Sequence, residues 1–285
     1  MLIRAALASL FVLAAPIAPA CALQTSEAET TAPGVQPTSR TVSTPDGRAV
    51  SISIWTAPEE RGVVVFSHGF GGAPSGYGRL LSEWAAHGFT VIAPLHVDSQ
   101  QHPDRKADGR TAFGTRLEDL ALTRGIAVRD HGGKPLIVAG HSFGSLMSLI
   151  AGGAKTLVGH HGDPAVKGVI AFSSPGAIPM VVTPETYRTL ATPLLMITGD
   201  QDVVPGYADD WRDHRLPFDG SPAGDKTLIV VAGAGHQLPS TAEGEQFDLL
   251  VRATEDFLDA YALTDAAAKA RLEVLSAAGV AVEHR

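Results

Sequence analysis

The chain has 285 residues, of which 45% are hydrophobic and 18% charged, and this composition fits one large globular domain with a sizeable core. Its formal net charge of −8, with the lysines and arginines dispersed, argues against nucleic acid as a partner. The single cysteine excludes an internal disulfide, so the fold depends on its hydrophobic core.

The N-terminus has the layout of a secretory signal peptide, which we assign to residues 1–22. Arg4 precedes an apolar run that a proline ends, and small residues follow; this run is too short for a stable membrane span. Cleavage is expected after Ala20 or Ala22, each of which completes an A-x-A pattern. Cys21 lies at the same point, and its lipidation is the alternative to release. We therefore expect a secreted or periplasmic protein.

A flexible leader is expected over residues 23–40, because this stretch is polar and rich in Pro, Ser and Thr. A single domain is then expected over residues 41–285. It should begin with a hairpin, because alternating residues flank the turn dipeptide Asp46-Gly47.

Short apolar runs alternate with amphipathic helical stretches through the rest of this domain. A strand followed by a helix, repeated, indicates βαβ units and a mostly parallel sheet covered by helices on both faces, an α/β fold. The expected strands are residues 63–67, 89–95, 135–140, 168–174, 193–199 and 227–233. The expected helices carry apolar stripes within residues 77–85, 113–121, 143–151 and 247–258, and an alanine-rich helical tail is expected from Thr264.

One pentapeptide at the end of an expected strand has the character of a nucleophile turn. Ser142 lies in Gly140-His141-Ser142-Phe143-Gly144, between the strand 135–140 and the following helix. A serine on a sharp strand-to-helix turn is exposed and needs small neighbours, which the two glycines supply. We therefore expect Ser142 to be a nucleophile, with the alternative that it only caps the helix.

Two further strand ends supply the partners that a nucleophilic serine needs. Asp202 follows the strand 193–199, and His236 follows the strand 227–233. Functional residues of parallel sheets gather at the carboxyl ends of the strands. We expect His236 to be the general base and Asp202 to orient its imidazole, with Asp200 as the alternative acid.

A backbone oxyanion hole is expected beside the serine. The N–H of Phe143 opens the helix after the nucleophile, where it can face a developing negative charge. The N–H of Phe70 is the second expected donor, because Ser67-His68-Gly69-Phe70-Gly71-Gly72 forms a glycine-rich loop after the strand 63–67. This loop lacks a Walker lysine or dinucleotide spacing, which argues against phosphate binding.

We expect no metal and no cofactor. Histidines and aspartates do gather on the long loop after the strand 89–95, and a metal site there is conceivable, but scattered polar residues on a solvated loop usually have no such role. These loop residues are His96, Asp98, His102, Asp104 and Asp108.

The sequence from about Thr41 to Leu258 resembles the α/β-hydrolase superfamily. It is most similar to the compact secreted group of cutinases and polyester hydrolases, with their chlorophyllase-like and platelet-activating-factor-acetylhydrolase-like relatives. The segment Gly69-Phe70 and the stretch LLSEWAAHGFTVI (80–92) carry this similarity. The resemblance implies the α/β-hydrolase fold, hydrolase activity, and an aromatic residue after the oxyanion glycine, which Phe70 matches.

Only 18 residues separate Ser174 from Pro193, where relatives with a lid domain insert helices. We therefore expect little or no lid and an open, shallow site for short acyl groups. The expected function is cleavage of small-molecule or polymeric carboxylic esters by a monomeric enzyme, with activity rising between about pH 6 and 7.5 as His236 becomes neutral. Amide or peptide hydrolysis by the same triad, and a catalytically silent binding protein on this fold, are the alternatives.

Overall fold

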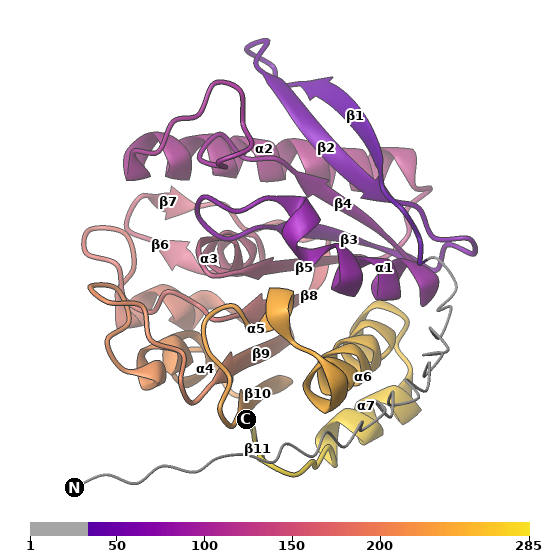
Figure 1. Ribbon diagram of the computed structural model, residues 1–285, viewed down its shortest axis with the longest axis vertical. Coiled ribbons are helices and arrows are strands. Elements are labelled where there is room, and N and C mark those ends of the chain that lie inside the picture. The colour runs from indigo at the N-terminus through magenta and orange to yellow at the C-terminus, as the bar shows by residue number, and fades with distance from the viewer. Residues whose placement is uncertain (1–33) are drawn as a thin grey trace, which may run out of the picture. The chain divides into compact units, whose positions relative to one another are not determined.

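A nine-stranded sheet forms the centre of the molecule in the computed structural model, which describes residues 34–285 (Figure 1). The expected signal peptide, Cys21 and the leader up to residue 33 lie outside the described residues. The strands are β1 (Thr38–Ser43), β2 (Ala49–Trp55), β3 (Gly62–Ser67), β4 (Phe89–Pro94), β5 (Leu136–His141), β8 (Val166–Phe172), β9 (Leu194–Gly199), β10 (Lys226–Val231) and β11 (Val280–His284).

The strand order is β1-β2-β4-β3-β5-β8-β9-β10-β11. The six strands from β4 to β10 in this order pair in parallel, and their residues are fully buried or nearly so, as strands covered on both faces are. The outer strands β1, β2 and β11 add antiparallel pairs at the two edges. The carboxyl ends of the parallel strands therefore share one edge of the sheet, where the candidate site lies.

Helices cover both faces of this sheet (Figure 1). One face packs against α1 (Gly78–Ala86), α6 (Gly244–Ala262) and α7 (Ala266–Glu273), and the other against α2 (Gly109–Asp130), α3 (Phe143–Ala151) and α4 (Leu216–Gly220). Short elements complete the chain: 3₁₀ helices η1 (Pro74–Tyr77), η2 (Pro184–Thr189) and η3 (Trp211–Arg215), α5 (Leu238–Thr241), and the small ladder of β6 (Lys155–Thr156) and β7 (Gly159–His160).

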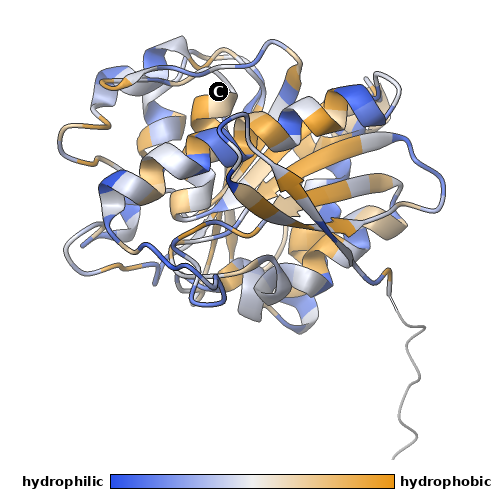
Figure 2. Ribbon diagram, turned by 90° about the horizontal axis from the view of Figure 1, so that it is seen from above, coloured by the Kyte–Doolittle hydropathy of each residue, from blue (hydrophilic) through white to orange (hydrophobic). Residues whose placement is uncertain are grey.

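The distribution of hydropathy follows this layering. Figure 2 shows the central strands as hydrophobic and the outer faces of the helices as largely hydrophilic. Each face has its own core, with Trp84 and Phe257 among the large buried side chains on one side and Tyr187 and Phe218 on the other. None of the helices in residues 34–285 is long and apolar enough to span a membrane.

The six parallel strands and the four helices expected from the sequence are all present, with boundaries shifted by a few residues. The expected hairpin is also confirmed: Ser43 pairs with Ala49 across a turn in which Gly47 has a φ of 88°. The first strand begins at Thr38 rather than at Thr41.

The expected helical tail is wrong beyond its first two turns. Helix α7 ends at Glu273, and Gly279, with a φ of 69°, turns the chain into β11. Val280 and Val282 then alternate with more exposed residues and pair antiparallel with β10, which closes that edge of the sheet. The high alanine content concealed this short alternating strand.

Candidate active site

Ser142 occupies the sharp turn between β5 and α3. Its backbone has a φ of 53° and a ψ of −120°, a region that residues with a side chain rarely adopt. Glycine is needed on both sides of the turn, because a Cβ at Gly140 would overlap the backbone of Gly144, and a Cβ at Gly144 would overlap the backbone of Ser67 in β3. This close approach of strand and helix presents Ser142 at the carboxyl edge of the sheet.

The structure brings Ser142, His236 and Asp202 into one chain of hydrogen bonds. Nδ1 of His236 lies 2.8 Å from Oδ1 of Asp202, and Nε2 of His236 lies 2.9 Å from Oγ of Ser142. A carboxylate only accepts hydrogen bonds, so Nδ1 of His236 carries a proton, and Nε2 is left to accept the serine proton. The histidine side chain is 18% exposed, whereas Asp202 is fully buried.

The alternative acid lies elsewhere. Oδ1 of Asp200 accepts the backbone N–H of Gly233 at 2.7 Å and stabilises the turn after β10. Of the two aspartates, only Asp202 contacts His236.

The carboxyl group of Asp202 is held in its ionised form. Burial by itself would raise its pKa, but hydrogen bonds from His214 and His236 outweigh this effect and hold the pKa far below its usual value. Thr198 donates a further hydrogen bond to Oδ2 at 2.8 Å. The ionised carboxylate can therefore stabilise the imidazolium that forms when His236 takes a proton.

The two expected oxyanion donors lie just after the neighbouring strands β3 and β5. Phe70 follows β3, and Phe143 is the first residue of α3. Across residues 34–285 neither backbone N–H has a hydrogen-bond acceptor. The two phenyl rings lie 6.2 Å apart between centroids, and Phe70 is 48% exposed.

A buried arginine fixes the loop that carries Phe70. Arg116 of α2 donates to both carboxylate oxygens of Asp98 at 2.8 Å, and to the carbonyl oxygens of His68 and Gly69 at 2.6 and 3.2 Å. Burial would raise the pKa of Asp98, but Arg116 lowers it to about 2, so both partners are charged. This bidentate pair connects α2, the loop after β4 and the oxyanion loop in one rigid unit.

A second Asp–His–Ser chain lies under the same loop. Nδ1 of His96 is 2.8 Å from Oδ2 of Asp119, and Nε2 of His96 is 2.9 Å from Oγ of Ser67. All three side chains are fully buried, and Arg48 donates to Oδ1 of Asp119 at 2.6 Å. The residues His96 and Asp98, considered as metal ligands in the sequence, are therefore structural partners of Asp119 and Arg116.

A tyrosine joins the oxyanion loop to the other two strand ends. Nε2–H of His141 donates to the carbonyl oxygen of His236 at 2.7 Å, and the hydroxyl of Tyr77 donates to Nδ1 of His141 at 2.7 Å. The same hydroxyl accepts the backbone N–H of Gly69 at 3.2 Å. Burial lowers the pKa of His141 to about 3, so its ring remains neutral in this network.

One group of side chains in the described part of the chain could geometrically hold a metal ion. The ligand atoms of Asp202, His214 and His236 lie within 4.8 Å of one another. However, protons occupy the space between them, because both imidazoles donate to the carboxylate of Asp202. Metal binding would displace these protons and disturb the contact of His236 with Ser142, so this chemistry does not favour a metal.

The region between Ser174 and Pro193 contains no long helix. It holds a short bridge between Ile178 and Val182 and the six-residue helix η2. Two pockets of about 230 and 180 Å³ in the described residues are not lined by the three triad residues, and the larger lies between α2 and α3. The short connection is compatible with the open site expected from the sequence.

Three residues that contact the site were missed in the sequence. His214 contacts Asp202, Arg116 contacts the oxyanion loop, and Tyr77 contacts His141. The burial of Arg116 could have been predicted from the sequence, since it lies on the inward face of α2 with the apolar residues Phe113 and Leu117. Tyr77 belongs to the apolar stripe expected within residues 77–85, which indicates packing, and His214 lies in a charged stretch without periodicity.

Comparisons with known proteins agree with this fold. Residues 58–189 match the family model described as "Serine aminopeptidase, S33". The chain has the α/β-hydrolase fold. A monoacylglycerol lipase of Mycolicibacterium smegmatis is 26% identical over 214 residues, which cover 72% of this chain and 74% of the lipase.

Two solved α/β-hydrolase structures share its architecture. A soluble variant of the monoglyceride lipase of Saccharomyces cerevisiae superposes with a TM-score of 0.61 and 16% identity, covering 78% of this chain and 94% of that one. The α/β hydrolase GrgF of Penicillium sp. sh18 gives a TM-score of 0.62 and 15% identity, covering 80% and 99%. These likenesses show the fold and do not confirm the narrower cutinase-like group.

Proposed function

We propose that this protein is a serine hydrolase that cleaves carboxylic esters through an acyl-enzyme. The observation that carries this proposal is the continuous hydrogen-bond chain from buried Asp202 through His236 to Ser142, with the serine held on a strained turn. The similarity to a monoacylglycerol lipase supports an ester as the substrate.

The proposed mechanism follows from the protonation of His236, which carries a proton on Nδ1 and none on Nε2. Nε2 of His236 removes the hydroxyl proton of Ser142 as Oγ attacks the ester carbonyl carbon. The N–H groups of Phe70 and Phe143 stabilise the resulting oxyanion. His236 then gives its proton to the leaving alcohol, and a water molecule, deprotonated by the same imidazole, releases the acid.

We propose short or unhindered acyl groups as the preferred substrates, because only a short connection lies between Ser174 and Pro193. The test is hydrolysis of p-nitrophenyl esters from acetyl to palmitoyl by the chain without its first 22 residues. We expect turnover that is greatest for short chains and is lost in Ser142→Ala. Absence of turnover from correctly folded protein would overturn the proposal.

A second candidate is amide hydrolysis, which the matched family description "Serine aminopeptidase" favours. The same triad attacks amides, but an amine is a poorer leaving group than an alcohol. Amino-acid p-nitroanilides, assayed beside the matching esters, separate the two. Ester turnover should exceed amide turnover by orders of magnitude, and the reverse order would make the protein an aminopeptidase. Failure of both panels would favour a silent binding protein.

We propose that residues 1–22 direct export, because a charged residue, an apolar run and A-x-A sites follow one another there. Expression of the complete chain in a bacterial host and mass analysis of the fractions test this. Export with a mature terminus at Cys21 or Leu23 supports it, a diacylglycerol mass on Cys21 identifies the anchored form, and retention of Met1 in the cytoplasm contradicts it.

A further inference from the structure

A second histidine contacts the acid of the triad. His214 lies on η3, and its side chain is fully buried. Its Nε2 lies 2.9 Å from Oδ1 of Asp202 and 3.1 Å from the carbonyl oxygen of the same residue. Its Nδ1 contacts the carbonyl oxygen of Ser174 after β8.

Each ring nitrogen of His214 therefore faces oxygen atoms that can only accept hydrogen bonds. A neutral imidazole has one N–H, so one of these contacts would bring two acceptors together without a proton. The other histidines of the site differ, because Nε2 of His236 faces the hydroxyl of Ser142 and Nδ1 of His141 faces the hydroxyl of Tyr77, and a hydroxyl can donate. Of these three rings, only that of His214 needs two protons.

We propose that His214 is a buried imidazolium that forms an ion pair with Asp202 and, through it, sets the pH at which His236 acts as a base. The proposal rests on the proposed function for its effect on catalysis, but the protonation of His214 follows from its contacts alone. Burial would lower the pKa of His214, but the hydrogen bonds that its ring donates to Asp202 outweigh this effect and raise the pKa, in agreement with the geometry.

The charge of His214 opposes the protonation of His236. The two rings are stacked with their centroids 5.8 Å apart, and Oδ1 of Asp202 accepts hydrogen bonds from both. A cation at this distance repels the imidazolium that His236 becomes, and its ion pair with Asp202 shares the negative charge that would stabilise that imidazolium.

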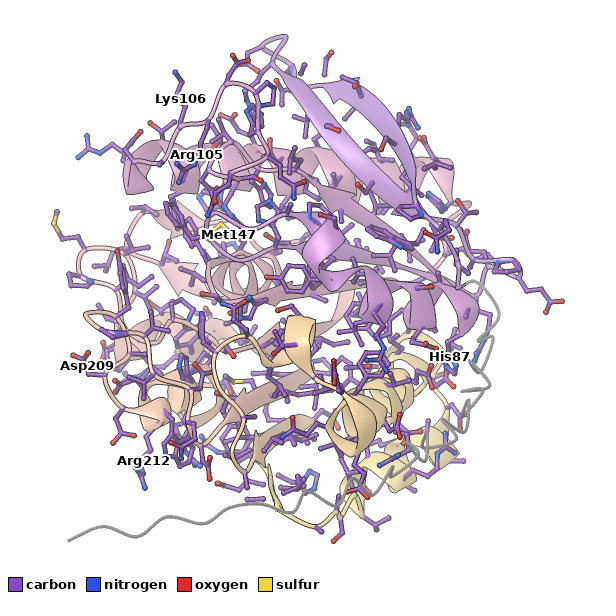
Figure 3. The ribbon with its side chains drawn as sticks, viewed as in Figure 1. His87, Arg105, Lys106, Met147, Asp209 and Arg212 are labelled. Atoms are coloured by element: carbon purple, nitrogen blue, oxygen red, sulfur yellow. The ribbon has the colours of Figure 1, made fainter. Side chains whose placement is uncertain are left out.

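The other charged groups near His214 do not face its ring in the same way. His141 lies behind His236, with the ring centroids of these two 4.8 Å apart, and it is neutral. On η3 itself, the charges of Arg212 and Arg215 pair with Asp210 and with Asp219 and Glu283. Arg212 lies at the periphery of the molecule in Figure 3. Asp213 accepts the N–H of Asp210. Asp202 and His236 are therefore the groups of the triad that face the ring of His214 directly.

The pH dependence of ester hydrolysis tests this coupling. His214→Gln keeps a neutral donor beside Asp202 and removes the charge. We expect the acidic limb of kcat/KM for p-nitrophenyl acetate to move to higher pH by about 0.5 to 2 units. This is the effect of removing one unit charge at this distance in a medium whose dielectric constant lies between those of water and of a protein interior. His160→Gln, an exposed histidine on β7, is the matched control and should leave the profile unchanged. A lower plateau without movement of the limb would indicate a merely structural role and overturn the proposal.

A measurement without catalysis gives an independent readout. In Ser142→Ala labelled with ¹⁵N at its histidine rings, we expect an imidazolium spectrum at pH 8 that disappears when His214→Gln is added. A neutral ring at this position would overturn the proposal even if esters are hydrolysed. Conversely, if the imidazolium is observed but the protein hydrolyses no ester, the result supports the protonation of His214 and contradicts only the proposed function.

Discussion

This molecule contains two Asp–His–Ser chains that have the same hydrogen-bond lengths but different surroundings. The edge chain is Asp202–His236–Ser142, and the interior chain is Asp119–His96–Ser67. In both, the aspartate lies 2.8 Å and the serine 2.9 Å from the imidazole. The imidazole side chain is 18% exposed in the edge chain and fully buried in the interior chain.

The electrostatics of the two chains are opposite. Hydrogen bonds from two histidines keep the pKa of Asp202 far below its usual value, although burial opposes them. Burial dominates at Asp119 and raises its pKa from 3.8 to about 6, against the attraction of Arg48. Burial and the charge of Arg116 also hold the pKa of His96 well below its usual value, so its ring remains neutral. Solvent access and a strongly stabilised negative charge on the acid, rather than hydrogen-bond lengths, separate a candidate catalytic triad from a structural support.

The two serines offer the largest contrast. We expect Ser142→Ala to lower kcat by about 10⁴ to 10⁶, because it removes the nucleophile. Ser67→Ala removes a buried donor to His96 and should lower the free energy of unfolding by about 1 to 3 kcal/mol, with kcat within about tenfold of wild type. Ester kinetics and urea unfolding of both variants provide the measurement, and equal losses of kcat would contradict the comparison.

Replacement of the two aspartates should also lower kcat much more in the edge chain than in the interior chain. Asp202→Asn allows the wrong tautomer of His236, and we expect kcat to fall by about 10⁴. Asp119→Asn alters only the support of the oxyanion loop, so kcat should stay within about tenfold. Kinetics at saturating ester measure both values, with circular dichroism to verify folding. A drop of 10³ or more in Asp119→Asn would give the interior chain a catalytic role.

The edge chain could be predicted from the sequence because each member follows an apolar strand directly. Ser142 also has the two flanking glycines that its turn requires. The interior chain could not be predicted in this way, since Asp119 and His96 come from a helix and a loop whose packing depends on the whole fold. Charged residues on the inward face of α2 were the available signal. The strand β11 was missed because alanine-rich composition hid its alternation.

Arg116 connects the two regions, so its replacement should affect both stability and rate. Arg116→Lys keeps the charge but loses part of the hydrogen-bond set to Asp98, His68 and Gly69. We expect kcat to fall by about 10- to 100-fold, since the N–H of Phe70 is no longer fixed, with a loss of about 1 to 3 kcal/mol in unfolding free energy.

The control for this variant is Arg110→Lys, an exposed arginine on the same helix. It should change neither quantity. If Arg116→Lys changes KM alone, the arginine does not act through the oxyanion loop.

The smallest expected effect is on the pH dependence of stability. The contributions of Asp119 and Asp202 to the free energy of unfolding should change in opposite directions as the pH rises. Asp119 has a folded pKa above its unfolded value, so its contribution is most favourable at low pH and is lost as pH rises through about 6. Asp202 has a folded pKa far below its unfolded value, so its contribution is present above about pH 4 and is lost as pH falls.

Urea unfolding of wild type, Asp119→Asn and Asp202→Asn between pH 3 and 8 separates these windows. As the pH rises from 4 to 7, the free energy of unfolding of Asp119→Asn should increase by about 2 to 3 kcal/mol relative to wild type. This is the free energy that corresponds to a rise of the Asp119 pKa from 3.8 to about 6 on folding. Asp202→Asn should show no such gain there and should instead approach wild type only below pH 4. Parallel curves for the two variants would mean that the folded environments change the pKa of the two carboxyl groups alike, and would contradict the electrostatic contrast between the two chains.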